Sequence, residues 1–177
     1  PQLTLLSGVG TFSGSNGNYT LNVGTLVVGE ASLQDRFQFS NVALAPSDLL
    51  TGSIAASGTG YTVYGAQQFP ALSAGSSYQG LVTQTDSSQT GTHSETIVIS
   101  PVDANITGYS SILPSQTVTV VDTVIGPATG DLLTGGPINL GTFYQGDAAA
   151  VALSITNASG TGAANLDVSA SPSRQAT

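Results

Sequence analysis

The chain contains a single histidine, His93, and two acidic residues lie close to it in the sequence. Glu95 follows two residues later, so in a strand the two side chains would share one face. Asp86 would lie across a hairpin from them. Imidazole and carboxylate groups of this kind can together bind a metal ion. The alternative is a histidine exposed on a hairpin, and this is the interpretation that we expect.

No motif for nucleophilic or nucleotide chemistry accompanies this histidine. Cysteine is absent, and no Gly-x-Ser-x-Gly sequence lies between a strand and a helix, as a serine hydrolase of the α/β type would require. The Gly-x-Gly sequences at 8–10 and 58–60 precede no helix that could bind a pyrophosphate, so both are predicted to be turns. The sequence therefore predicts that this protein is not an enzyme.

Three aspartates, Asp122, Asp131 and Asp147, flank a segment rich in glycine and proline. Calcium binds hard oxygen ligands such as carboxylates, and these three could converge on a calcium ion at a junction between domains. No D-x-[DN]-x-[DN]-G loop is present. Solvated surface acids are the simpler interpretation. Calcium at the junction stays the alternative, and no other cofactor is predicted.

Four tyrosines could form a sugar-binding face, because tyrosine combines a large apolar ring with a hydroxyl group. They are Tyr61, Tyr64, Tyr78 and Tyr109. The chain has no tryptophan and only 5 phenylalanines, so its core needs other large side chains. We therefore expect these tyrosines to fill the core or the edges of a sheet.

The charge balance excludes several classes of partner. Lys and Arg total 2 while Asp and Glu total 10, which gives a net charge of −8. Two cations cannot neutralise the phosphates of a nucleic acid, and an anionic membrane surface is disfavoured for the same reason. No apolar run approaches the 18 residues that a membrane-spanning helix needs, so we expect no direct membrane insertion of these residues. The absence of cysteine is compatible with export.

Alternation of apolar and polar residues, which is the pattern of strands, recurs along the chain. The clearest strands are expected at 19–23, 36–40, 61–64, 81–85, 96–100 and 117–124. Turn residues separate them at 15–18, 57–60, 86–88 and 135–137. Short strands with frequent turns predict an all-β sandwich.

An internal repeat divides the chain. Residues 22–26, NVGTL, recur as 139–143, NLGTF, and residues 37–41 correspond to 153–157. The sequence therefore predicts a tandem repeat. Its parts are the end of a preceding unit or a linker at 1–18, a sandwich at 19–124, a linker at 125–137 and the start of a second, incomplete unit at 138–177.

The ordered series of short motifs at 19–25, 48–53, 72–77, 90–96 and 108–110, restarting at 139–142, resembles a known family. These motifs are similar to the choice-of-anchor D type β-repeats of large bacterial surface proteins, which belong to the wider ASPM–SPD-2–Hydin class. The resemblance implies an immunoglobulin-like antiparallel β-sandwich with an extracellular or cell-surface location. It implies a structural or adhesive role and no catalytic residues.

Two functions follow as hypotheses. The first is a structural or adhesive repeat of a secreted or surface-anchored adhesin, biofilm matrix or filament protein. Its partners would be neighbouring repeats of the same protein, and self-association would occur by strand pairing at the incomplete second unit. The alternative is a β-sandwich module that binds a carbohydrate or another protein, which an exposed apolar or tyrosine-lined patch would favour.

Overall fold

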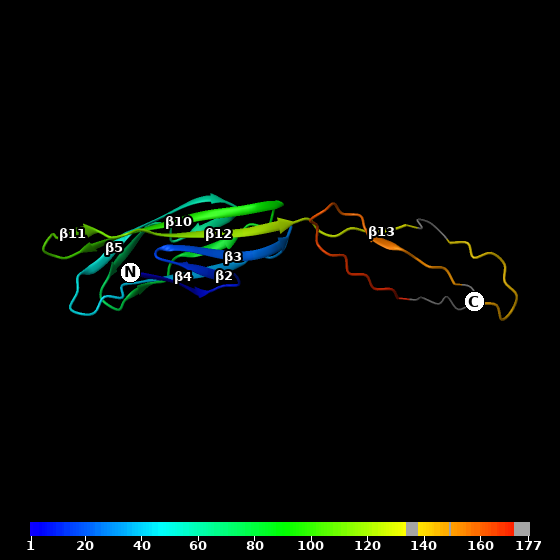
Figure 1. Cartoon of the computed structure of the whole chain (residues 1–177), viewed down its shortest axis with the longest axis horizontal. Coiled ribbons are helices and arrows are strands. Elements are labelled where there is room, and N and C mark those ends of the chain that lie inside the picture. The colour runs from blue at the N-terminus through cyan, green and yellow to red at the C-terminus, as the bar shows by residue number, and fades with distance from the viewer. Residues whose placement is uncertain (134–137, 149, 172–177) are drawn as a thin grey trace. The chain divides into compact units, whose positions relative to one another are not determined.

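The computed structural model describes residues 1–133, 138–148 and 150–171, and its contacts divide the chain into two units. Unit 1 comprises Pro1–Val124 and unit 2 comprises Ile125–Thr177. The regular elements of the described residues are all β-strands, which confirms the predicted all-β class (Figure 1). The turn predicted at 135–137 lies outside the described residues.

Unit 1 is a sandwich of two sheets. Sheet A has the strand order β1, β4, β9, β6, with β8 also paired to β4. Its strands are β1 (Gln2–Ser7), β4 (Gln34–Ser40), β6 (Tyr61–Tyr64), β8 (Ser77–Tyr78) and β9 (Val82–Thr85). Sheet B has the order β2, β3, β12, β10, β5, β7, with β11 paired to β10. Its strands are β2 (Thr11–Ser15), β3 (Asn18–Val27), β5 (Leu49–Thr59), β7 (Gln68–Leu72), β10 (Gly91–Ala104), β11 (Ser110–Ile112) and β12 (Gln116–Ile125).

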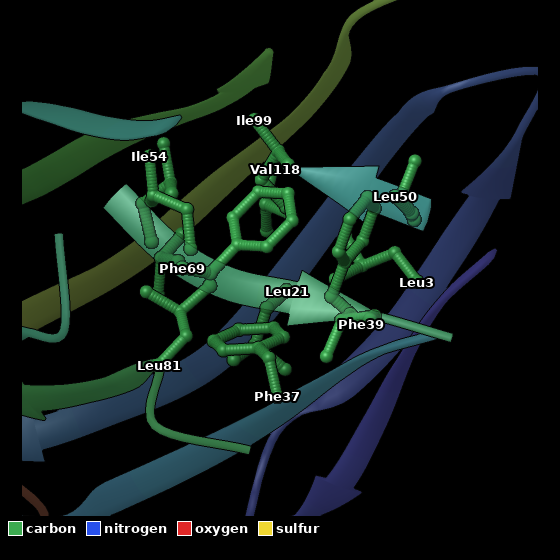
Figure 2. Packing of buried hydrophobic residues seen from close by; sticks show 13 residues of the cluster. Leu3, Leu21, Phe37, Phe39, Leu50, Ile54, Phe69, Leu81, Ile99 and Val118 are labelled. Carbon is green, nitrogen blue, oxygen red and sulfur yellow. The ribbon is translucent and has the colours of Figure 1, made fainter. Parts of the chain in front are cut away.

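The core of unit 1 lies between the sheets, where alternate side chains of facing strands meet (Figure 2). Phe37 and Phe39 of β4 and Ile97 and Ile99 of β10 are almost completely buried. The rings of Phe39 and Phe69 pack edge to face, with their centroids 5.2 Å apart. Because successive residues of a strand point to opposite faces, this arrangement follows directly from the period of two in the sequence.

All six strands expected from the alternation are present, as parts of β3, β4, β6, β10 and β12 and as β9, which begins one residue later than expected. The turn predicted at 15–18 is also present, since Ser15 pairs with Asn18 across the β2–β3 hairpin. Asn16 and Gly17 between them have φ angles of 52° and 81°. Positive φ at both central residues is the geometry of a type I′ turn, which asparagine and glycine favour.

Two of the expected boundaries were wrong. Residues 1–18 are not the end of a preceding unit, because β1 pairs with β4 and places Leu3 opposite Phe39 in the core of unit 1. Residues 57–60 are not one turn, because β5 continues to Thr59 and pairs with β10. Gly60 alone separates β5 of sheet B from β6 of sheet A.

In the described part of unit 2 there is one short ladder, in which β13 (Gly130–Leu132) pairs antiparallel with β14 (Ile155–Asn157). The segment predicted as a linker at 125–137 therefore contributes a strand to unit 2, and its residues 134–137 lie outside the described part. In this ladder Leu132 faces Ile155, just as Leu3 faces Phe39 in the ladder of β1 and β4. Ile155 is also the repeat counterpart of Phe39 in the sequence.

Two local hydrogen-bond patterns occur in both units. The side chain of Asn22 accepts a hydrogen bond from the amide of Gly24, and Asn139 accepts one from Gly141, each at 2.9 Å. A second pattern is a turn closed by an acidic residue, with bonds in both directions. The carboxylate of Glu30 accepts a hydrogen bond of 2.9 Å from the amide of Val27, and that of Asp147 accepts one of 3.1 Å from the amide of Tyr144. In return, the amides of Glu30 and Asp147 donate to the carbonyls of Val27 and Tyr144.

Candidate functional site

Buried polar side chains gather between the two sheets of unit 1. On sheet B the inward row of β10 changes from Ile99 and Ile97 to Glu95 and His93, and all four are buried. Asp122 of β12 is the direct cross-strand neighbour of His93. The inward row of β10 therefore becomes polar toward its beginning, and the inward row of β12 places Asp122 between the buried Val120 and Val124 at the same level.

Sheet A contributes further polar groups. Asp35 of β4 lies opposite Thr83 of β9 in the ladder, and Tyr61 of β6 lies opposite Thr85. Asp35 and Thr83 are completely buried. The carboxyl groups of Asp122, Asp35 and Glu95 interact electrostatically with the hydroxyl of Tyr61. These three carboxyl groups come from both sheets. We call Asp35, Tyr61, His93, Glu95 and Asp122 the acidic cluster.

Direct contacts within the acidic cluster are few. Nδ1 of His93 lies 3.0 Å from Oδ1 of Asp122, an ion-pair distance without the alignment of a hydrogen bond. Neither carboxylate oxygen of Asp122 has a hydrogen-bond partner among the protein groups. Oδ1 of Asp35 accepts a hydrogen bond of 2.9 Å from the amide of Val9, while its Oδ2 has no such partner. Burying unpaired carboxylate oxygens costs free energy, so the cluster opposes the stability that the apolar core provides.

Burial moves the protonation equilibria of three of these groups. It raises the pKa of the Asp35 carboxyl, an effect that backbone hydrogen bonds from Val9 and Gly10 partly oppose. Burial also raises the pKa of Glu95. For the Tyr61 hydroxyl, burial is the main reason for a raised pKa, and the neighbouring carboxylate of Asp122 adds to it. These shifts all favour the neutral form in the folded protein.

Glycine residues make room for the side chains of the acidic cluster. A Cβ atom at Gly58 would lie 2.7 Å from Oε2 of Glu95. A Cβ atom at Gly60 would overlap the imidazole ring of His93, and Gly60 also has a φ of +84°. The sequence predicted a turn at these glycines, whereas Gly58 lies within β5 and Gly60 directly follows it, and both leave space for the side chains of His93 and Glu95.

Replacement of Gly60 by alanine is expected to lower the unfolding free energy of unit 1 by about 2–4 kcal/mol, because backbone strain and overlap with His93 add together. Gly24 is the matched control, since its φ is +99° but no atom lies within 4 Å of a Cβ built there. Gly24→Ala should cost only about 1–2 kcal/mol. Denaturant unfolding followed by circular dichroism measures both values, and equal losses would contradict the proposed overlap. In the double variant Gly60→Ala with His93→Ala the total loss should be less than the sum of the two single losses, because the overlap disappears once the imidazole is removed.

The expectation that His93 is an exposed hairpin residue was wrong, because its side chain is only 11% exposed. Glu95 does share its face, as the spacing of two predicted. Asp86 is exposed in the turn between β9 and β10. Its carboxylate accepts a hydrogen bond from the amide of Ser88, and the bonds with Ser88 lower its pKa.

The three calcium candidates have different surroundings. Asp122 is buried inside unit 1, so the interpretation as a solvated surface acid was wrong for this residue. Asp131 is exposed in β13, and the exposed Asp147 accepts the hydrogen bond from Tyr144 in the turn of unit 2. Within residues 1–133, 138–148 and 150–171, no group of three or more His, Asp or Glu side chains is placed to hold a metal ion.

The four tyrosines divide into two pairs. Tyr61 and Tyr78 pack against the core, as expected for core or edge residues. Tyr64 and Tyr109 are about half exposed, at 49% and 53%, in β6 of sheet A and just before β11 of sheet B.

Sequence reasoning missed Asp35 as a member of the cluster, although a signal was present. Asp35, Phe37 and Phe39 follow one another at a spacing of two, as do His93, Glu95, Ile97 and Ile99. Extending each apolar row by one or two steps would have placed these polar groups on the inward face.

No protein-family model matches the sequence, and no curated protein is significantly similar to it. Among the described residues there is no helix long and apolar enough to cross a membrane.

Proposed function

We propose that this chain is a structural or adhesive repeat module of a secreted or surface-anchored bacterial protein, such as an adhesin, a biofilm matrix component or a filament subunit. The observation that carries the proposal is the repetition of local structure in the two units. The ladder of β13 and β14, the asparagine–glycine turn and the acidic turn of unit 2 all have counterparts in unit 1. Tandem units of one immunoglobulin-like fold extend a chain and present many similar surfaces.

Features of unit 1 fit a mechanical role better than a chemical one. The two longest strands, β5 and β10, are joined by a continuous ladder that runs from Thr59 and Ser94 to Leu49 and Ala104. The net charge of −8 and the two cationic side chains argue against nucleic acid as a partner. Neighbouring repeats of the same protein are the partners that this function requires.

Unit 2 supports the idea that such modules assemble by strand pairing. Two of its exposed apolar residues are the repeat counterparts of buried residues in unit 1: Leu153 and Ile155, at 58% and 44% exposed, correspond to Phe37 and Phe39. Short strands with exposed apolar side chains and free edges can pair with strands of another molecule. We propose that the face of β13 and β14 is where one molecule associates with a second copy.

In light scattering and sedimentation at tens of micromolar protein, the full chain is therefore expected to form dimers or larger species. Leu132→Asp combined with Ile155→Asp should return the chain to a monomer, because charges on the exposed ladder oppose association. Leu44→Asp is the control, since Leu44 is 89% exposed in a loop of unit 1. A full chain that is as monomeric as a chain ending at Val124 would contradict assembly by strand pairing.

The alternative function, a module that binds a carbohydrate or another protein, is favoured by one feature of unit 1. The hairpin of β10 and β11 exposes Ile106 and Ile112, at 94% and 85%. A contiguous exposed apolar patch would mark a binding surface, and these two side chains lie in the same hairpin. If the full chain proves monomeric, glycan arrays with an Ile106→Ser and Ile112→Ser variant as the comparison would test this alternative.

A further inference from the structure

The acidic cluster has an unusual charge balance for the interior of a sandwich. Its titratable groups come from four strands: Asp35 from β4, Tyr61 from β6, His93 and Glu95 from β10, and Asp122 from β12. Asp86 is the nearby charged group outside, in the turn between β9 and β10. Thus three buried carboxyl groups share the interior with one imidazole.

Cations do not balance these carboxyl groups within the described residues. The chain has no lysine, and its arginines are Arg36 and Arg174, of which Arg174 lies outside the described part. Arg36 is exposed on β4 and donates a hydrogen bond of 2.9 Å to the carbonyl of Gln79. Both oxygens of Asp122 and one oxygen of Asp35 lack a hydrogen-bond partner among the protein groups. Ionising all three carboxyl groups would therefore place like charges between the sheets with little compensation.

We propose that the acidic cluster is a proton-binding lock, which holds the two sheets of unit 1 together while Asp35 and Glu95 carry protons and loosens the end of the sandwich around the cluster as these two residues ionise. At acidic pH, neutral Asp35 and Glu95 would remove the repulsion between the carboxyl groups of the acidic cluster. As the pH rises, the lock loses these protons. The proposal is independent of what the protein binds or assembles with.

Repulsion between the ionised carboxyl groups would separate β6 first. This strand has only four residues and forms the edge of sheet A, where it is paired with β9. Its residue Tyr61 lies against the carboxyl groups of the other sheet. The lock also lies beside the end of unit 1, since Asp122 precedes the boundary at Val124 by two residues. A pH-dependent opening at this position would therefore loosen the strand through which the chain leaves the sandwich.

The direction in which pH changes stability follows from the shifted pKa values of Asp35 and Glu95. Asp35 and Glu95 have raised pKa values in the folded protein, against ordinary values of 3.8 and 4.5. Between the ordinary and the raised values, the folded protein binds more protons than the unfolded chain. The stabilisation is therefore complete below the ordinary values and is lost as the pH rises through the raised ones.

Thermal unfolding of the full chain between pH 4.5 and 8 tests the proposal. The melting temperature of unit 1, followed by circular dichroism and by tyrosine fluorescence, should be higher at the acidic end by about 3–6 °C. Glu95→Gln and Asp35→Asn should each reduce this pH dependence, because neither replacement titrates. Asp103→Asn is the control on the same strand as Glu95, in the part of β10 that pairs with Leu50 and Ser111, and should leave the dependence unchanged.

Three measurements on the unmodified chain keep the test decisive if a variant does not fold. In carbon-13 nuclear magnetic resonance the Glu95 carboxyl should titrate above 4.5, and a midpoint at or below that value would overturn the proposal. A melting temperature that is flat or rises with pH would also overturn it. If EDTA lowers the melting temperature at pH 7 and calcium restores it, the carboxyl groups hold a metal ion instead, and the lock is wrong.

Discussion

Replacing Phe39 with alanine is expected to lower the unfolding free energy of unit 1 by about 3–5 kcal/mol, the usual cost of removing a buried phenylalanine side chain. Phe39 is 1% exposed and packs edge to face against Phe69. It also faces Leu3 across the ladder of β1 and β4. The loss of these contacts would leave a cavity between the sheets, and denaturant unfolding followed by circular dichroism measures its cost.

Unit 2 supplies the matched control for this prediction. Ile155 occupies the corresponding place in the ladder of β13 and β14, opposite Leu132, but is 44% exposed. Ile155→Ala should therefore change the unfolding free energy of unit 2 by less than about 1 kcal/mol, since surface substitutions have small effects. If both replacements cost the same, the described difference in burial between the two units would be wrong.

Replacement of His93 by leucine is expected to destabilise unit 1 by about 3 kcal/mol, the upper end of the usual cost of leaving a buried polar group without its partner. The remaining carboxylate of Asp122 would then be buried without its neighbour at 3.0 Å. The double variant His93→Leu and Asp122→Leu should recover most of the loss, because apolar side chains of similar size satisfy the interior without buried charge. Chemical unfolding at pH 7 provides the comparison.

Thr92→Leu is the control for these variants, because Thr92 is exposed and precedes His93 on the same strand. It should leave the unfolding free energy nearly unchanged. If the double variant is as unstable as His93→Leu alone, the pair is not the source of the cost. Recovery in the double variant would instead indicate that the polar end of the sandwich is kept for a property other than stability, such as the response to pH proposed above.

The proposed response to pH and the expected recovery in the double variant have the same cause, which is the difference between the apolar core and the buried carboxyl groups. Apolar side chains such as Phe37 and Phe39, or Ile97 and Ile99, stabilise the sandwich because folding removes their surface from water. The cluster at the end of the same rows includes carboxyl groups whose oxygens lose water without gaining partners. Unit 1 therefore combines a stabilising core with a destabilising end, and protons change the balance between them.

The sequence alone determined the fold class and much of the local structure. Alternating apolar residues predicted six strands, because a strand that buries one face must alternate, and all six are present. The Asn16-Gly17 turn was predictable since few other residues adopt positive φ. Strand β5, with its glycine, alanine and serine residues, was missed because side chains so small give little alternation in hydrophobicity.

Only the tertiary structure decided which residues form the acidic cluster. Asp35, Tyr61, His93 and Asp122 lie in four strands that are far apart in the sequence, and Glu95 shares a strand with His93. A period of two tells which face of its own strand each residue occupies, but not which strands become neighbours or which sheet lies opposite. Strand pairing placed His93 beside Asp122, and packing of the sheets brought Tyr61 close to Asp122. The single histidine was visible from the start, whereas its burial among carboxyl groups followed from long-range pairing that no local pattern encodes.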